Sequence, residues 1–325
     1  MDFTIKQYQQ LLTSLQHAGF FFQTFAEYMQ HKESSSPTSA NDSFPDTHKS
    51  QPLQPPTPNP RHKTQNSEQR TLNPERPTPN PERPTPNPER PTSNPEHRTP
   101  NKLIILRHDV DLLPQNSLRF ARIQHELGIT GSYYFRAVTE SWDEDVILEI
   151  HGLGHEVGYH YESLTTCNGN IGAAYLDFVT NLERLRTLVP VTTICMHGSP
   201  RSPHDSKDLW KHYDYRTIGI LGEPYFDLDF NKFFYLTDTG RRWDGWRVSV
   251  RDKVPQQDKW VGEGLVFRSS SDIIKAANEG RLPSRIMMTF HPQRWNDKPL
   301  PWIKELLWQG VKNVGKRILV QTKKG

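Results

Sequence analysis

The chain has 325 residues, 34% of them hydrophobic, and its 40 basic and 37 acidic side chains leave a net charge of only +3. This length allows one or two domains, and so small a charge gives no electrostatic reason to expect binding to nucleic acid or to an anionic membrane surface. Two cysteines are too few for a disulfide framework or a cysteine-rich zinc site, and they indicate a reducing compartment. With neither a secretory signal nor an apolar run of ~18 residues, we expect a cytoplasmic protein without a membrane span.

Residues 1–32 are predicted to be the helical N-terminal part of the main domain. Thr4 can cap a helix, and Gly19 suits its C-terminal stop. The apolar face of this helix is formed by Ile5, Tyr8, Leu11, Leu12 and Leu15. The aromatic run Phe20–Phe22 that follows is typical of a core segment.

Residues 33–101 contain 17 of the 27 prolines and almost no apolar side chains. The unit Asn-Pro-Glu-Arg-Pro-Thr-Pro begins at Asn73, recurs from Asn80, recurs from Asn87 with Ser93 as its last residue, and returns imperfectly from Asn94. Such a segment cannot offset the entropy of ordering, so we expect a disordered, extended linker inserted into the domain. Its repeats could bind a proline-recognising partner, although composition alone indicates a spacer.

From residue 102 to 325, strands and helices alternate. Residues 103–106 are a buried strand, because four apolar residues run directly into the polar sequence Arg107 to Asp111. Further strands are expected at 131–135, 155–160, 191–196, 217–221, 233–236 and 285–290. Helices are expected from Pro114 to Gly128, over 143–153 and 173–188, from a cap at Ser271 to Gly280, and from Pro301 with Trp302, Leu306, Val311 and Val314 inward. This alternation predicts a parallel sheet, and about seven units favour a closed or nearly closed barrel.

Several of these strands end in ionisable side chains. The carboxyl ends of parallel strands meet on one face, so we expect the following residues to gather there: His108, Asp109, Asp111, His160, His197 and His291.

Asp109 and Asp111 are two residues apart, so in a strand both point to one side. Two close carboxylates favour one metal ligand and one general base, although Asp111 could instead cap the helix before Pro114. His160 is a candidate ligand, with Glu162 or His197 as the third, whereas His155 is interpreted as structural. His291 ends the last strand, which lies next to the first strand in a barrel. We therefore interpret His291 as a general acid.

One loop, from Asp238 to Trp246, is dense in Trp, Arg and Asp. This composition is equally compatible with a sugar-binding surface and with an ordinary loop.

The ordered motifs Arg-His-Asp-Val-Asp, His-Glu-Val-Gly-Tyr-His and a late strand ending in histidine resemble the polysaccharide-deacetylase-like (NodB-homology, carbohydrate-esterase) superfamily. A bacterial branch found with surface-polysaccharide genes is similar in Met196 to Pro200, in Asp238 with Arg241 to Trp243, and in His291-Pro292. The resemblance implies a distorted (β/α)7 barrel, a divalent metal, usually zinc, and removal of an acetyl group from an amino sugar or glycan by a metal-activated water. It maps the catalytic base onto Asp109 and the acid onto His291.

For the metal, the resemblance implies ligands at Asp111 and His160. The chain differs from the family at two points. Leu164 stands where a second metal histidine is expected, and Val110 separates two acids that are adjacent in typical members. The site is then either rebuilt, with Glu162 or His197 as a ligand, or lost. The alternatives are a non-catalytic carbohydrate-binding or assembly protein and an amidase acting on a non-sugar C–N bond.

Overall fold

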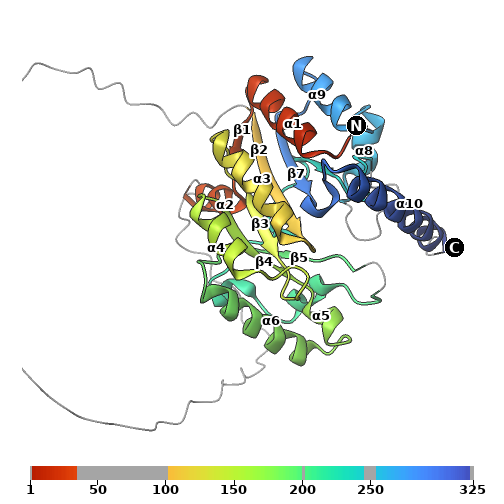
Figure 1. The fold of residues 1–325 in the computed structure, drawn as a ribbon. Helices are drawn as coiled ribbons and strands as arrows, with labels where there is room; N and C mark the ends of the chain where they lie inside the picture. Colours follow the sequence, from red (N-terminus) through yellow and green to blue (C-terminus); the bar gives the residue numbers. More distant parts are fainter. Residues whose placement is uncertain (1, 35–101, 200–201, 245–253, 323–325) are drawn as a thin grey trace, which may run out of the picture. The chain divides into compact units, whose positions relative to one another are not determined.

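The computed structural model describes residues 2–34, 102–199, 202–244 and 254–322 (Figure 1). Almost all of the predicted proline-rich linker, residues 35–101, lies outside this range, as does the end of the Trp-rich loop. The two flanking segments, 2–34 and the chain from residue 102, belong to one compact unit. That unit is an α/β fold built on a parallel sheet.

The described sheet has seven strands, and every ladder in it is parallel. They are β1 (Phe21–Gln23), β2 (Leu103–Val110), β3 (Ser132–Phe135), β4 (Glu156–Tyr161), β5 (Ile194–Met196), β6 (Phe234–Thr237) and β7 (Arg285–Phe290). The order is β5-β4-β3-β2-β7-β6. The long central strand β2 is bordered on one side by β7, and on the other by β1 along its first half and β3 along its second.

Helices alternate with these strands (Figure 1). They are α1 (Ile5–His17), α2 (Phe25–Ser34), α3 (Pro114–Glu126), α4 (Glu144–Gly152), α5 (Ser163–Thr166), α6 (Ile171–Arg186), α7 (Pro224–Asp227), α8 (Gln257–Gly262), α9 (Ser270–Asn278) and α10 (Pro299–Thr322). Helix α1 begins as predicted, with the Thr4 hydroxyl accepting the Gln7 amide at 3.1 Å. Helix α3 begins with Pro114 in its first turn.

Most predicted elements are confirmed within a few residues. The strand predicted at 217–221 is wrong, because Tyr215–Ile218 is a 3-10 helix and only Gly222 bridges to the residues before β5. The cap predicted at Ser271 is wrong by two residues, since Ser269 caps α9 in a reciprocal capping box with Asp272. On α10, Leu306 was expected inward but is 44% exposed. The side chains of Val311 and Val314 lie outside the described part.

The sheet curls into a half-barrel and not a closed barrel, since no ladder joins β5 to β6 among the residues described. All eight residues of β2 are buried, so both of its faces are covered. Alternation along β2 turns Arg107 and Asp109 to one face and His108 to the other. The prediction that His108 joins the polar cluster is therefore wrong.

His108 instead belongs to an aromatic layer under α1 and α3. Its ring stacks on Tyr133 with centroids 4.1 Å apart, and its Nε2 lies 3.1 Å from the Tyr8 hydroxyl. Its Nδ1 lies 3.1 Å from the Ser132 carbonyl oxygen. Burial lowers the pKa of His108 to about 3, so the ring is neutral.

Candidate metal centre

The carboxyl ends of β2, β4, β5 and β7 bring five predicted site residues together. Asp109 lies in β2 and Asp111 just after it, His160 lies in β4, His197 follows β5, and His291 follows β7. These residues span more than half of the chain, and the parallel sheet makes them neighbours because its strand ends share one edge.

Three of them form a group that could hold a metal ion. Asp111, His160 and His197 each offer one ligand atom, and these atoms lie within 4.8 Å of one another. The Nε2 atoms of His160 and of His197 are each 3.6 Å from the same oxygen, Oδ1 of Asp111. Two imidazoles and one carboxylate are a ligand set that suits zinc and other divalent transition metals.

Both imidazoles are held so that Nε2 faces this point. The Nδ1 of His160 lies 2.9 Å from the Cys195 carbonyl oxygen, an acceptor only, so Nδ1 carries the proton. The Nδ1 of His197 lies 2.8 Å from Glu162 Oε2, and its backbone amide donates to Tyr161 in β4. In its neutral form each ring would therefore offer its Nε2 lone pair to the space beside Asp111.

Glu162, an alternative ligand in the sequence-based prediction, is not one of these three residues but orients one of them, His197. Its Oε1 accepts from Arg136 Nε at 2.9 Å and Nη2 at 2.5 Å, while its other oxygen bonds His197. Burial alone raises the pKa of Glu162, but His197 and Arg136 outweigh that effect and lower it to about 2. Arg136 also donates to the Asp111 carbonyl oxygen at 3.1 Å, which ties the loop after β2 to this pair.

Asp111 does not cap α3. Leu113 occupies the cap position with a left-handed φ of 55° and no side-chain bond. Asp111 Oδ2 accepts from Gln293 Nε2 at 2.9 Å, whereas the buried Oδ1 has no hydrogen-bond partner among the described residues. Burial raises the pKa of Asp111, but His160, His197 and His291, in their protonated forms, outweigh burial and lower it well below its ordinary value.

Asp109 lies beside this group and is immobilised by an ion pair. Arg107 Nε and Nη2 donate to its two oxygens at 2.8 and 2.7 Å, and both residues are almost fully buried. Burial opposes ionisation, yet the charges of Arg107, His160 and His291 lower the Asp109 pKa overall. Asp109, His160 and Cys195 form a second group of close ligand atoms, but Arg107 already neutralises the carboxylate there.

His291 stands on the other side of Asp109. Its Nε2 is 3.8 Å from Asp109 Oδ2, the same oxygen that lies 3.8 Å from His160 Nε2. Its Nδ1 lies 2.5 Å from Oδ1 of Asp238, a fully buried carboxylate that also accepts from the Trp295 indole at 2.6 Å. Arg294 donates to Asp238 as well, at 3.2 Å.

The positioning role of Asp238 was missed by the sequence analysis. The resemblance included Asp238, but its pairing with His291 becomes visible only once β6, which Asp238 follows, and β7 are known to be neighbours. The nearby loop does not form an exposed aromatic surface in its described part, since Trp243 is buried and its indole donates to Ser270. His155 is structural as expected, with Nε2 2.9 Å from the Ala121 carbonyl oxygen.

Comparisons with protein-family models, with curated proteins and with solved structures found no match for this chain.

Proposed function

We propose that the protein is a metal-dependent hydrolase in which Asp111, His160 and His197 hold a divalent ion, zinc being the best fit. The observation that carries this proposal is the buried Asp111 Oδ1, which has no hydrogen-bond partner among the described residues and has an imidazole Nε2 on each of two sides at 3.6 Å. A buried carboxylate oxygen without a partner is costly. A cation in contact with all three atoms would remove that cost.

The separations suit a small cation. Tetrahedral zinc with bonds of about 2.0–2.1 Å keeps its ligand atoms about 3.3 Å apart. The 3.6 Å distances from Asp111 Oδ1 to the two Nε2 atoms are close to that value. Three protein ligands leave one coordination position open, as in catalytic zinc sites, and the bound metal would lower the pKa of a water there and polarise a carbonyl.

The surrounding residues suit acid–base chemistry on an acyl group. Asp109 Oδ2 is the proposed proton acceptor, since it is ionised and fixed between His160 and His291. Arg107 keeps this carboxylate in place at the expense of some basicity. With its Nδ1 bonded to Asp238, His291 directs Nε2 toward the site and can deliver a proton to a leaving amine or alcohol.

The finer assignment follows from the motifs. We infer a distorted (β/α)7 barrel of the polysaccharide-deacetylase type and an acetylated amino sugar or glycan as the substrate, because the ordered motifs resemble that superfamily. In this interpretation His197 replaces the ligand that the family draws from the position of Leu164. Leu164 itself is a buried core residue in α5, so the metal site is rebuilt from β5.

Zinc titration of the full-length protein by calorimetry tests the metal site. We expect stoichiometric binding at neutral pH, weakened at least about tenfold by Asp111→Asn and by His197→Ala. The matched control His151→Gln, on an exposed residue of α4, leaves binding unchanged. Absence of zinc binding by the wild-type protein would contradict the proposal and favour a non-catalytic carbohydrate-binding or assembly role.

Acetate release from N- and O-acetylated sugars tests the reaction. We expect Asp109→Asn to lower turnover by about 10²–10⁴-fold, the usual contribution of a general base, while zinc binding persists. Release of ammonia from simple amides, with no acetate from sugars, would replace the deacetylase proposal by the amidase alternative. Zinc binding without turnover of either kind would contradict the hydrolase proposal itself.

A further inference from the structure

Helix α10 packs on the domain with its polar side. Trp302, Gln309 and Asn313 lie on one face of the helix, and this face makes its contacts. The Trp302 indole donates to the Asp2 carbonyl oxygen at 2.8 Å, and Asn313 donates to the Gly240 carbonyl oxygen at 2.9 Å. Gln309 is only 6% exposed.

The opposite side of α10 is apolar and exposed. Leu300, Ile303 and Leu307, spaced i, i+3 and i+7, are 81%, 46% and 66% exposed. In the sequence the same spacing continues through Val311, Val314 and Ile318, whose side chains lie outside the described part. We call Leu300, Ile303 and Leu307 the apolar stripe. An ordinary surface helix has the reverse arrangement, so this stripe calls for something to cover it.

Basic residues are exposed on the same helix. Lys304 is exposed, and Lys312 lies 5.0 Å over the ring of Trp308, itself 53% exposed. Residues 298–325 hold seven Lys or Arg and a single acid, Glu305, and so contribute +6, whereas residues 1–297 carry −3. The small net charge of the chain therefore conceals a strongly basic segment, within which α10 itself holds four Lys or Arg and one acid.

We propose that α10 is a membrane-surface helix that binds anionic phospholipids, with the apolar stripe in the interface and the lysines at the headgroups. An apolar stripe, a tryptophan and basic residues are the properties of helices that lie in the plane of a membrane. None of the described helices has the length and apolar character needed to cross a bilayer, so attachment would be peripheral. This inference does not depend on the proposed hydrolase function.

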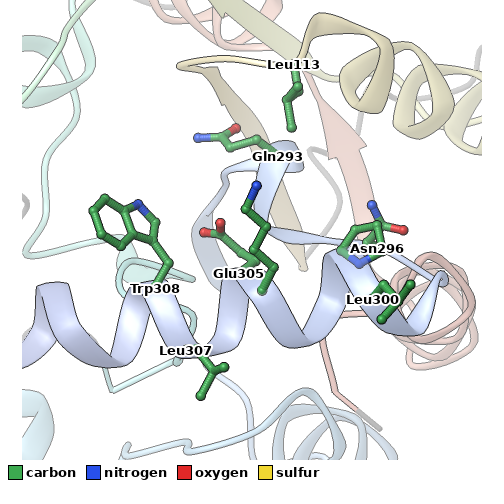
Figure 2. Close-up of a pocket in the computed structure, with 9 residues that line it drawn as sticks. Leu113, Gln293, Asn296, Leu300, Glu305, Leu307 and Trp308 are labelled. Atoms are coloured by element: carbon green, nitrogen blue, oxygen red, sulfur yellow. The ribbon is translucent and has the colours of Figure 1, made fainter.

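Two other occupants fit less well. A second copy of the chain would bring one +6 segment against another, which opposes association. A small apolar ligand could occupy the pocket of about 880 Å³ between α10 and Leu113, where Gln293, Glu305 and Trp308 lie on one side of the helix (Figure 2). Ile303 does not line this pocket, so such a ligand would leave part of the stripe exposed.

Vesicle co-sedimentation of the full-length protein tests the proposal. We expect binding to vesicles of phosphatidylcholine mixed with phosphatidylserine, and little to phosphatidylcholine alone. The double variant Ile303→Gln/Leu307→Gln keeps helix-forming residues and should weaken binding at least about tenfold. The matched control Leu148→Gln/Leu176→Gln changes two exposed leucines of α4 and α6 and should bind as the wild type does.

The charge contribution has its own pair of variants. Lys304→Gln/Lys312→Gln should weaken binding by about 30-fold, since each basic residue near an anionic surface contributes about fivefold. Lys259→Gln/Lys275→Gln removes the same charge from α8 and α9 and should have little effect. Absence of vesicle binding would overturn the proposal. So would a dimer in light scattering that the Ile303→Gln/Leu307→Gln variant abolishes, because a second copy would then cover the stripe.

Discussion

Replacement of His108 by phenylalanine should make the protein less sensitive to acid. Burial lowers the His108 pKa from 6.5 to about 3, so in that window the unfolded chain takes up a proton that the folded chain does not. Stability from this group is fully present above pH 6.5 and is lost as the pH falls toward about 3. At about 1.4 kcal/mol per pKa unit, the full loss is about 5 kcal/mol, comparable with the total stability of many domains.

The variant removes the pH dependence due to His108 but lowers the free energy of unfolding by a constant amount at every pH. Phenylalanine keeps the stack on Tyr133 but loses the bonds to Tyr8, to Gln124 and to the Ser132 carbonyl oxygen, at a cost of about 1–3 kcal/mol. At pH 4 the wild type has already lost about 3 kcal/mol through His108. The two stability curves should therefore converge or cross between pH 6.5 and 4, with the wild type more stable above that range.

Urea unfolding followed by tryptophan fluorescence at a series of pH values measures both curves. The difference between the two proteins isolates His108, because other titrating groups contribute to both. His151→Gln on the exposed side of α4 should keep the wild-type pH dependence. Parallel curves for the wild type and His108→Phe would refute the reasoning, because they would mean that His108 takes up a proton as readily in the folded protein as in the unfolded chain.

Three further outcomes are expected. Asp238→Asn, which leaves His291 without its carboxylate partner, should lower hydrolysis by about 10²–10⁴-fold with zinc affinity intact. Glu162→Gln should weaken zinc binding by about 10–100-fold, measured by competition with a chelator, since it loosens His197. Burial raises the pKa of Glu223 from 4.5 to about 7, so between these pH values the folded protein holds a proton that the unfolded chain has released. The free energy of unfolding should therefore fall by about 3 kcal/mol as the pH rises from 4.5 to 7. Glu223→Gln should flatten urea-measured stability across that window, and an unchanged slope would contradict this assignment.

Strand ends could be predicted from the sequence because local signals specify them. The apolar run before Arg107 and the proline at the start of α3 place Asp109 and Asp111 at the end of β2 without any tertiary information. Parallel alternation then predicts that His160, from β4, reaches the same edge. These inferences need only side-chain period and handedness, which are properties of the backbone.

The face on which each side chain lies was harder to predict. His108 has the same residue type and strand-end position as the other candidates, yet the two-residue period of β2 turns it away from Asp109. The partnership of Asp238 with His291 depends on β6 lying next to β7, which no local pattern encodes. The segment at 217–221 has strand-like residues, but the Asp214 side chain accepts the Arg216 amide and stabilises a 3-10 helix instead.

The most informative departure from the expected motif is Leu164, because it separates loss of a metal site from its reconstruction. If no cation bound here, nothing would require a carboxylate to fix the orientation of His197, and Asp111 could relax toward α3 as its cap. Instead Glu162 holds the His197 Nδ1, Arg136 holds Glu162 and the Asp111 carbonyl oxygen, and Asp111 Oδ1 faces both Nε2 atoms. A network that orients three lone-pair donors toward one point, and leaves one of them without a hydrogen bond in the described structure, favours reconstruction.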